Sequence, residues 1–213
     1  MIKLSSTSKM KITGKRVKSW SLPAGSSCPG SSDAEICKSC YAKKGMYHFP
    51  SVKNLREHNK LDYHRNNWVD DMVKEVSKCD YFRWFDSGDI ETPELATKIA
   101  EVCRLCPNTI FWLPTRSDKI PAINAAIVAT TRTAYCHSLS SLPNVALRIS
   151  ADNIGLNNRE RPGVNSYVIN QEDIFEAKRQ GIHVCPVGVQ PNRKSCNDCT
   201  MCYTSAKVAY VLH

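Results

Sequence analysis

The sequence has no run of about 20 consecutive apolar residues, the length that a membrane-spanning helix needs. Its first residues, MIKLSSTSKMKITGKRVK, contain no apolar core of the kind found in secretory signals. Internal repeats and low-complexity tracts are missing, and the histidines form no HxH or HxxxH pair. These absences predict a cytoplasmic protein without a membrane partner.

The length of 213 residues is enough to bury one core, and the composition, 42% hydrophobic and 23% charged, is that of an ordinary globular domain. We therefore expect a single α/β domain over residues 1–213. Six Lys or Arg fall within residues 1–18, which we interpret as a flexible basic arm. Residues 186–213 form a cysteine-rich C-terminal segment, and we expect the tail after Pro186 to be loop-like.

The formal net charge is 29 − 20 = +9, which suits a polyanionic partner such as nucleic acid. A basic, solvated surface with no such partner is the alternative. The residues predicted to form a basic aromatic surface for single-stranded nucleic acid are Lys43, Lys44, Arg56, Lys60 and Arg65, with Tyr47 and Tyr63 among them.

Apolar, β-rich runs alternate with helix-period segments, a pattern typical of a βαβ architecture with a parallel sheet. The predicted strands are 17–22, 81–85, 109–113, 145–150, 166–169 and 182–185. The predicted helices are 52–65, 68–78, one that begins after the cap Thr92, 122–130, and one from the cap Asn170 to Gly181. About six β/α units are fewer than the eight of a complete barrel. We predict a partial TIM-like (β/α)6 barrel, with an open doubly wound sheet as the alternative.

Eleven cysteines are many for such a chain, and an odd number cannot pair fully within it. In a reducing cytosol, clustered cysteines are typical metal ligands because thiolates bind iron–sulfur clusters and zinc. One group is Cys28, Cys37 and Cys40. Its three thiolates would leave one iron of a [4Fe–4S] cluster open to another ligand.

The second group consists of Cys185, Cys196, Cys199 and Cys202. A C-x2-C-x2-C run with a distant Cys-Pro is close to the ferredoxin spacing, and four thiolates can close a cluster. One or two clusters are therefore expected. Zinc is the alternative, including one shared site of Cys37, Cys40, Cys196 and Cys199. We interpret the other four cysteines, Cys79, Cys103, Cys106 and Cys136, as structural.

Polar residues follow the predicted strands, where α/β folds gather their function. Asp86 and Asp89 are candidate catalytic carboxylates, able to bind an amine or a metal or to move a proton; an Asx turn that caps the next helix is the alternative. Thr115 is a candidate cofactor contact. Arg116 is a candidate anion-binding residue, and Asp152 ends another strand in a similar place.

The stretch SLPAGSSCPG…CKSCYAKKG, followed by RWFDSGDIETPE and WLPTRS, resembles the phage gene product 88 family. The resemblance covers most of the chain and includes the C-terminal cysteine group. It implies a bacteriophage or prophage protein, located in the host cytoplasm, with a partial barrel and a cluster in the loop after the first strand.

More remotely, the chain is similar to radical S-adenosylmethionine (SAM) enzymes, in which the open iron of a three-cysteine [4Fe–4S] cluster binds SAM. This similarity implies that Cys28, Cys37 and Cys40 hold the cluster and that Tyr41 is its aromatic neighbour. Ser87, Gly88 and Asp89 would hold the SAM amino group, and Arg148 and Ser150 would face its ribose or carboxylate. The second cysteine group would resemble an auxiliary cluster.

The chain departs from that pattern in two places: its spacing is C-x8-C-x2-C where C-x3-C-x2-C is usual, and it has Ser-Gly-Asp in place of Gly-Gly-Glu-Pro. The expected function is a phage iron–sulfur protein that resembles radical SAM enzymes. The alternative is a non-enzymatic iron–sulfur or zinc protein that binds nucleic acid or a host protein.

Overall fold

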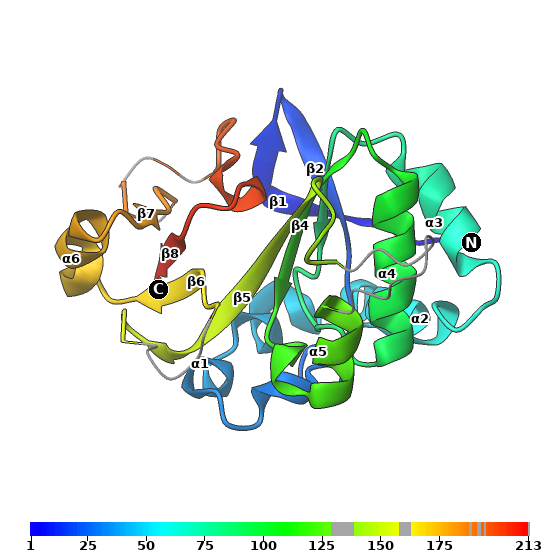
Figure 1. Ribbon diagram of the computed structural model, residues 1–213, viewed down its shortest axis with the longest axis horizontal. Helices are drawn as coiled ribbons and strands as arrows, with labels where there is room; N and C mark the ends of the chain where they lie inside the picture. Colours follow the sequence, from blue (N-terminus) through cyan, green and yellow to red (C-terminus); the bar gives the residue numbers. More distant parts are fainter. Residues whose placement is uncertain (129–138, 158–162, 188, 191–192, 194, 213) are drawn as a thin grey trace.

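A computed structural model describes residues 1–128, 139–157, 163–187, 189–190, 193 and 195–212 (Figure 1). Its centre is an eight-stranded sheet with the order β1-β2-β3-β4-β5-β6-β8-β7. The strands are β1 (Ser5–Ile12), β2 (Lys15–Trp20), β3 (Tyr81–Trp84), β4 (Ile110–Thr115), β5 (Val145–Ile154), β6 (Ser166–Ile169), β7 (His183–Val184) and β8 (Val208–Val211). β1 is antiparallel to β2, and every other neighbouring pair is parallel.

From β2 to β6, each strand lies beside the next strand of the chain. In a doubly wound sheet the strand order reverses at a switch point near the middle, so that alternative is wrong. The predicted α/β class with a mostly parallel sheet is confirmed. Among the described strands no pairing joins β1 to β7, so the sheet has two open edges.

Four helices cover one face of β2–β4: α2 (Pro50–Asp62), α3 (Trp68–Val76), α4 (Pro93–Leu105) and α5 (Pro121–Val128) (Figure 1). The helices α1 (Glu35–Lys38) and α6 (Ile174–Arg179) lie nearer β5–β8. Short 3-10 segments are η1 (Pro29–Ser31), η2 (Tyr41–Lys43), η3 (Gly45–His48), η4 (Ser117–Lys119), η5 (Gln171–Asp173) and η6 (Met201–Tyr203). In the described ranges, no helix has the length and apolar character to cross a membrane.

The helix boundaries follow the predicted caps. The Thr92 hydroxyl accepts a hydrogen bond from the Leu95 N–H, 3.1 Å away, and Pro93 is the first residue of α4. Asn170 forms a capping box with Asp173, and Gly181 has the left-handed φ of +70° that ends a helix. The predicted caps Thr92 and Asn170 are therefore confirmed. The last two residues of the predicted 122–130 helix lie outside the described residues.

Successive side chains along each strand point to opposite faces of the sheet. Phe82 and Trp84 of β3 pack under the helices, where Trp20 makes edge-to-face contacts with Trp68 and Trp84. On the other face, Trp112 of β4 packs against the C-terminal segment around η6. The C-terminal cysteine group therefore lies on the face that the helices leave open.

Two predictions about the ends of the chain are wrong. Residues 5–12 are strand β1, so the lysine-rich N-terminal segment is an edge of the sheet and not a flexible arm. Lysine is common on edge strands because it discourages edge-to-edge pairing. The polar composition of residues 5–12 is the reason why the sequence did not indicate a strand there. The tail after Pro186 was expected to be loop-like, but it contains β8, which inserts between β6 and β7.

Candidate functional site

The first cysteine group lies in the segment between β2 and α2. Cys28 precedes η1, Cys37 is in α1, and Cys40 precedes η2; all three are partly exposed. The Cys28 sulfur accepts a hydrogen bond from the Gly25 N–H at 3.4 Å. Burial raises the pKa of Cys28 to about 11, and the charges of Asp89, Cys40 and Cys37 act in the same direction. The structure thus brings these three predicted ligands together as neighbours.

Close backbone packing fixes this loop against the ends of β3 and β4. A Cβ on Gly30 would lie 2.1 Å from the Arg116 carbonyl oxygen, so only glycine fits there. Gly88 has a φ of +73°, and a Cβ on it would lie 2.6 Å from the Leu22 Cβ. The two glycines allow the loop after β2 to contact the next two strand ends directly.

Asp89, predicted as a catalytic carboxylate, is buried with its oxygens bonded to neighbouring groups. It accepts hydrogen bonds from the Thr115 hydroxyl at 2.6 Å, the Ile90 N–H at 2.8 Å and the Arg116 N–H at 2.7 Å. Its own N–H donates to the Ser27 carbonyl at 2.8 Å. Burial raises the pKa of Asp89 in spite of these donors. These bonds join the ends of β3 and β4 and do not form the helix-capping Asx turn, because the next helix is capped by Thr92. The predicted catalytic role of Asp89 and the predicted cofactor contact of Thr115 stay predictions.

Asp86 and Ser87 form a buried polar network at the end of β3. Asp86 pairs with Arg56 at 3.0 Å and accepts a hydrogen bond from Ser21, while its carbonyl accepts one from the Tyr41 hydroxyl at 2.7 Å. Ser87 accepts a bond from Arg56 and donates to the Leu22 carbonyl at 2.8 Å. Arg56 was predicted on a basic surface, but it is 6% exposed and holds this network.

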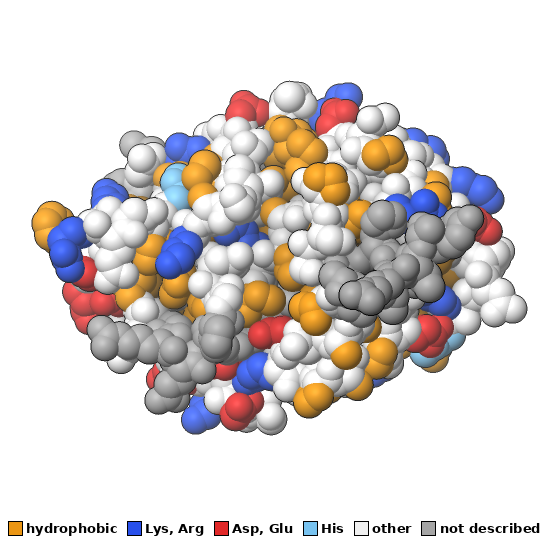
Figure 2. All heavy atoms as spheres, viewed as in Figure 1, with side chains coloured by type: hydrophobic (Ala, Val, Ile, Leu, Met, Phe, Trp, Pro, Cys, Tyr) orange, Lys and Arg blue, Asp and Glu red, His pale blue; other side chains and the backbone are white. Residues whose placement is uncertain are grey.

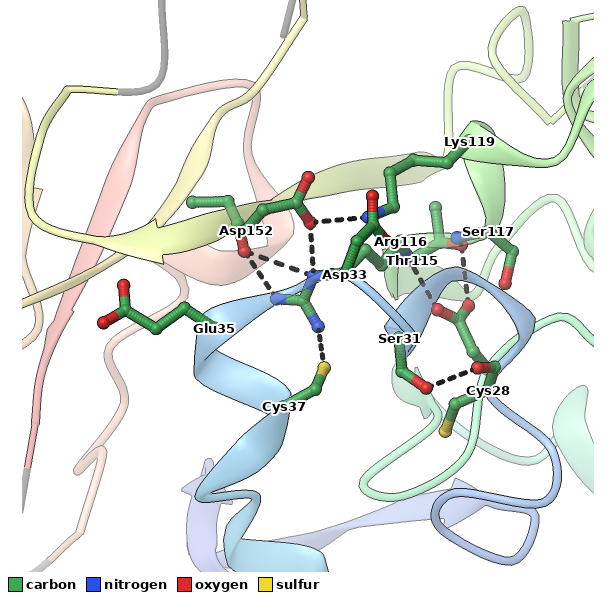
Figure 3. Close-up of polar contacts among 12 residues, drawn as sticks. Cys28, Ser31, Asp33, Glu35, Cys37, Thr115, Arg116, Ser117, Lys119 and Asp152 are labelled. Atoms are coloured by element: carbon green, nitrogen blue, oxygen red, sulfur yellow. Dashed lines mark hydrogen bonds and ion pairs between the residues drawn. The ribbon is translucent and has the colours of Figure 1, made fainter. Parts of the chain in front are cut away.

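Arg116 contacts the first cysteine group from the end of β4 (Figure 3). Its Nη1 lies 3.1 Å from the Cys37 sulfur. Its Nε lies 3.2 Å from an Asp152 carboxylate oxygen, and Lys119 lies 3.3 Å from the same oxygen. Burial raises the pKa of Cys37, whereas the positive charge of Arg116 lowers it. Both strand-end residues noticed in the sequence, Arg116 and Asp152, therefore belong to this site.

An open pocket of about 370 Å³ borders the first group at Cys28. It is lined by Gly25, Ser26, Cys28, Pro29, Lys60, Tyr63, His64, Glu91 and Thr92. The pocket carries charges of both signs, since Lys60 and Glu91 form an ion pair at 3.5 Å. The sequence did not indicate Glu91 as a lining residue, because Glu91 lies beyond the turn of residues 86–89 that follows β3.

The four cysteines of the second group line one small cavity. Cys185, Cys196, Cys199 and Cys202 share it with His183, Pro186, Val187 and Met201. The Cys202 sulfur is within hydrogen-bond distance, 3.1 Å, of the Tyr210 hydroxyl. Burial raises the pKa of Cys196 to about 11, and the charges of Cys202, Cys185 and Cys199 add to that rise. The second predicted ligand set is thus also brought together.

Two arginines of the open sheet face lie close to this group. Arg148 is fully buried, and its guanidinium donates to backbone carbonyls of Cys202, Asn165, Ala206, Met201 and Thr204. Arg83 stacks over Trp112 at 4.2 Å, and its buried Nε has no hydrogen-bond partner. The positive charges of Arg148 and Arg83 lower the pKa of Cys202, against the larger effect of burial.

Arg148 therefore holds the loop that carries Cys202, and its predicted contact with ribose or carboxylate stays a prediction. Ser150 lies opposite Ser166 in the register of β5 and β6. Tyr41 is 59% exposed, with its hydroxyl bonded to the Asp86 carbonyl. Their predicted roles toward SAM are likewise still predictions.

The two cysteine groups lie at different places on the sheet. The first follows the end of β2, whereas Asp198 of the second accepts a hydrogen bond from the Thr13 N–H, 2.6 Å away, in the turn before β2 (Figure 1). The small cavity that the second group lines contains no cysteine of the first group. The alternative of one zinc site shared by Cys37, Cys40, Cys196 and Cys199 stays a prediction.

The described cysteines are all free thiols. Cys103 and Cys106 are buried in the core under the helices, and Cys79 packs against it, as their structural interpretation predicts; Cys136 lies outside the described residues. Within the described ranges, no three His, Cys, Asp or Glu side chains are arranged around one point that could hold a metal ion.

The predicted basic aromatic surface does not form as one exposed face. Arg56 is buried, Arg65 pairs with Asp62 at 2.7 Å and Asp71 at 2.9 Å, and Lys60 pairs with Glu91. On the side of the molecule drawn in Figure 2, Lys and Arg side chains are scattered among acidic and neutral ones. Nucleic-acid binding stays a prediction without a defined surface.

Residues 2–204 match the family model described as Gene product 88. Comparison with curated proteins and with solved structures found no match.

Proposed function

Because the chain belongs to the phage gene product 88 family, we propose for this member of the family that it is an iron–sulfur protein with two thiolate-bound centres. Cys185, Cys196, Cys199 and Cys202 would hold one centre. Cys28, Cys37 and Cys40 would hold the other and leave one coordination position open. The observation that carries the proposal is the gathering of the four C-terminal cysteines around one small cavity.

The surroundings of that cavity suit a negatively charged centre. Among the described side chains, no carboxylate forms an ion pair with Arg83 or Arg148, and the positive charges of both act on Cys202. Burying an unpaired cation is costly, and an anionic thiolate centre beside it reduces that cost. The donor set of four sulfurs without a carboxylate also fits iron–sulfur or zinc better than harder metals.

The spacing of the ligands favours iron over zinc. The C-x2-C-x2-C run with a distant Cys-Pro is close to the ferredoxin arrangement. The consecutive order of β2 to β6 is compatible with a partial barrel. When bound, a three-cysteine [4Fe–4S] cluster supplies an open iron for SAM. Around it, Asp89 and Gly30 would fix the loop, and Arg116 would contact Cys37.

Anaerobic purification tests the proposal directly. We expect iron and acid-labile sulfide at about eight of each per chain, as two [4Fe–4S] clusters require. Replacing Cys185, Cys196, Cys199 and Cys202 with Ala should reduce both to about half. Cys79→Ala is the matched control, because Cys79 belongs to neither group, and it should keep the full content.

A colourless protein that contains zinc without sulfide would contradict the proposal. The radical SAM component has its own test: the reduced, cluster-loaded protein should cleave SAM to 5′-deoxyadenosine, and Cys37→Ala should abolish this. A protein with intact clusters that leaves SAM uncleaved would remain an iron–sulfur protein but would lose the radical assignment.

A further inference from the structure

We propose that Arg116 is a positioning residue that sets the reduction potential of the centre held by Cys28, Cys37 and Cys40, an inference that rests on the function proposed above. Figure 3 shows its guanidinium between α1 and β5, with one nitrogen directed at the Cys37 sulfur. That nitrogen, Nη1, lies 3.1 Å from the sulfur. Arg116 is thus a cation in direct contact with a candidate ligand atom.

The side chain of Arg116 is fixed by contacts away from the sulfur. Its Nη2 donates to the Ala151 carbonyl at 2.6 Å, and its Nε lies 3.2 Å from both that carbonyl and an Asp152 oxygen. The side chain is 16% exposed. A guanidinium held on one side by a carbonyl and a carboxylate presents its remaining nitrogen in a defined direction, which a flexible surface arginine cannot do.

The backbone of Arg116 is fixed as well. Its N–H donates to Asp89 at 2.7 Å, and its carbonyl packs against Gly30, where a Cβ would lie at 2.1 Å. Gly30 belongs to the Cys28 loop, and Cys37 belongs to α1. One residue therefore contacts both segments that carry the cysteines, so its position relative to the proposed centre is determined by the fold.

Charged groups of both signs surround this contact. Among the described residues, Lys119 lies 3.3 Å from Asp152 and 2.6 Å from Asp33, so Arg116, Lys119 and these two carboxylates belong to one network behind the sulfur. Only Arg116 of these four reaches Cys37. Reduction adds one negative charge to an iron–sulfur centre, and an N–H···S bond from a cation stabilises the reduced form more than the oxidised form. Arg116 should therefore raise the reduction potential.

The test uses the full-length, cluster-loaded protein and follows each cluster by paramagnetic resonance during a redox titration. In Arg116→Gln the potential of the N-terminal cluster should shift to a more negative value. Arg116→Lys, which keeps the charge but loses the planar fork, should shift it less. The C-terminal cluster of the same molecule is an internal reference and should keep its potential, as should both clusters in the control Arg104→Gln, which removes an exposed cation on α4.

The outcomes separate the two proposals. If the unsubstituted protein binds no cluster, the proposed function fails. If it binds both clusters and Arg116→Gln leaves the N-terminal potential unchanged, only the role of Arg116 is overturned. If Arg116→Gln loses its iron at the first group, the Arg116→Lys variant decides the question. An N-terminal cluster potential in Arg116→Lys more negative than in the unsubstituted protein supports the proposal, and an unchanged potential overturns it.

Discussion

At Gly88 the backbone passes so close to Leu22 that any side chain would collide with it. The φ of +73° adds a second constraint, because L-residues with a side chain rarely adopt it. Gly88→Ala should therefore lower the free energy of unfolding by about 2 to 4 kcal/mol, combining backbone strain with overpacking. Urea denaturation followed by tryptophan fluorescence measures this change.

Gly14→Ala is the matched control for that variant. Gly14 has nearly the same φ, +74°, but nothing lies within 4 Å of the position of its Cβ. Gly14→Ala should lower the free energy of unfolding by the backbone contribution alone, about 1 to 2 kcal/mol. Equal losses in the two variants would show that contact with Leu22 does not matter.

At the residue scale, the sequence indicated the two groups of cysteines and the polar residues that follow the strands, because both depend on local spacing. It did not predict what the strand-end residues contact. Asp89 bonds to Thr115 and Arg116, 26 and 27 residues away, and these partners depend on how β3 and β4 align. Gly30 was interpreted as a loop residue that allows close wrapping, but its neighbour, the Arg116 carbonyl, is visible only in the structure.

Among the elements, β8 has the largest consequence for the candidate site. It is paired with β6 on one side and β7 on the other, and Cys185 donates its N–H to the Ala209 carbonyl at 2.8 Å. Ala209→Pro should disrupt this central strand, because proline has no N–H and is found in sheets only at edges. We expect loss of iron from the C-terminal group alone, about half of the total, measured by iron content and resonance spectra.

Ala209→Gly is the control for β8. It keeps the backbone N–H and removes one methyl group, so it should retain both centres with a loss of stability of about 1 kcal/mol. If Ala209→Pro keeps its full iron content, the C-terminal group does not depend on β8.

Most elements were predictable from periodicity, and β6 agrees with its predicted range of 166–169. The helices α2 and α4 also follow their predicted starts to within a few residues. β8 is as short as β6, and it was missed because its four residues, VAYV, follow a cysteine-rich segment that was interpreted as a loop. Its position between β6 and β7 is a matter of topology, which local sequence does not encode.

Across the whole molecule, both cysteine groups contain thiols whose pKa lies above the ordinary value. Burial raises the pKa of Cys28 and of Cys196 to about 11, so both are protonated at neutral pH in the metal-free protein. A metal must displace these protons, and its affinity should therefore rise with pH, by up to about tenfold per pH unit for each proton displaced. Titration with Co²⁺ between pH 6.5 and 8.5, followed by its thiolate absorption, measures this.

A variant with Ala at all seven ligand positions is the control for that titration and should show no thiolate absorption. An affinity that stays constant over this pH range would contradict the protonated state assigned to these cysteines. Calorimetry in two buffers of different ionisation enthalpy gives the number of protons released.

The insertion of β8 between β6 and β7 has a consequence for how the chain is made. During synthesis on the ribosome, the Cys185 segment emerges well before the strand that it lies against. The N-terminal cysteines, by contrast, lie next to β2, β3 and β4, which are all available earlier. Maturation should therefore proceed in order: the proposed N-terminal centre can form on a nascent chain, whereas the proposed C-terminal centre must wait until translation has passed β8.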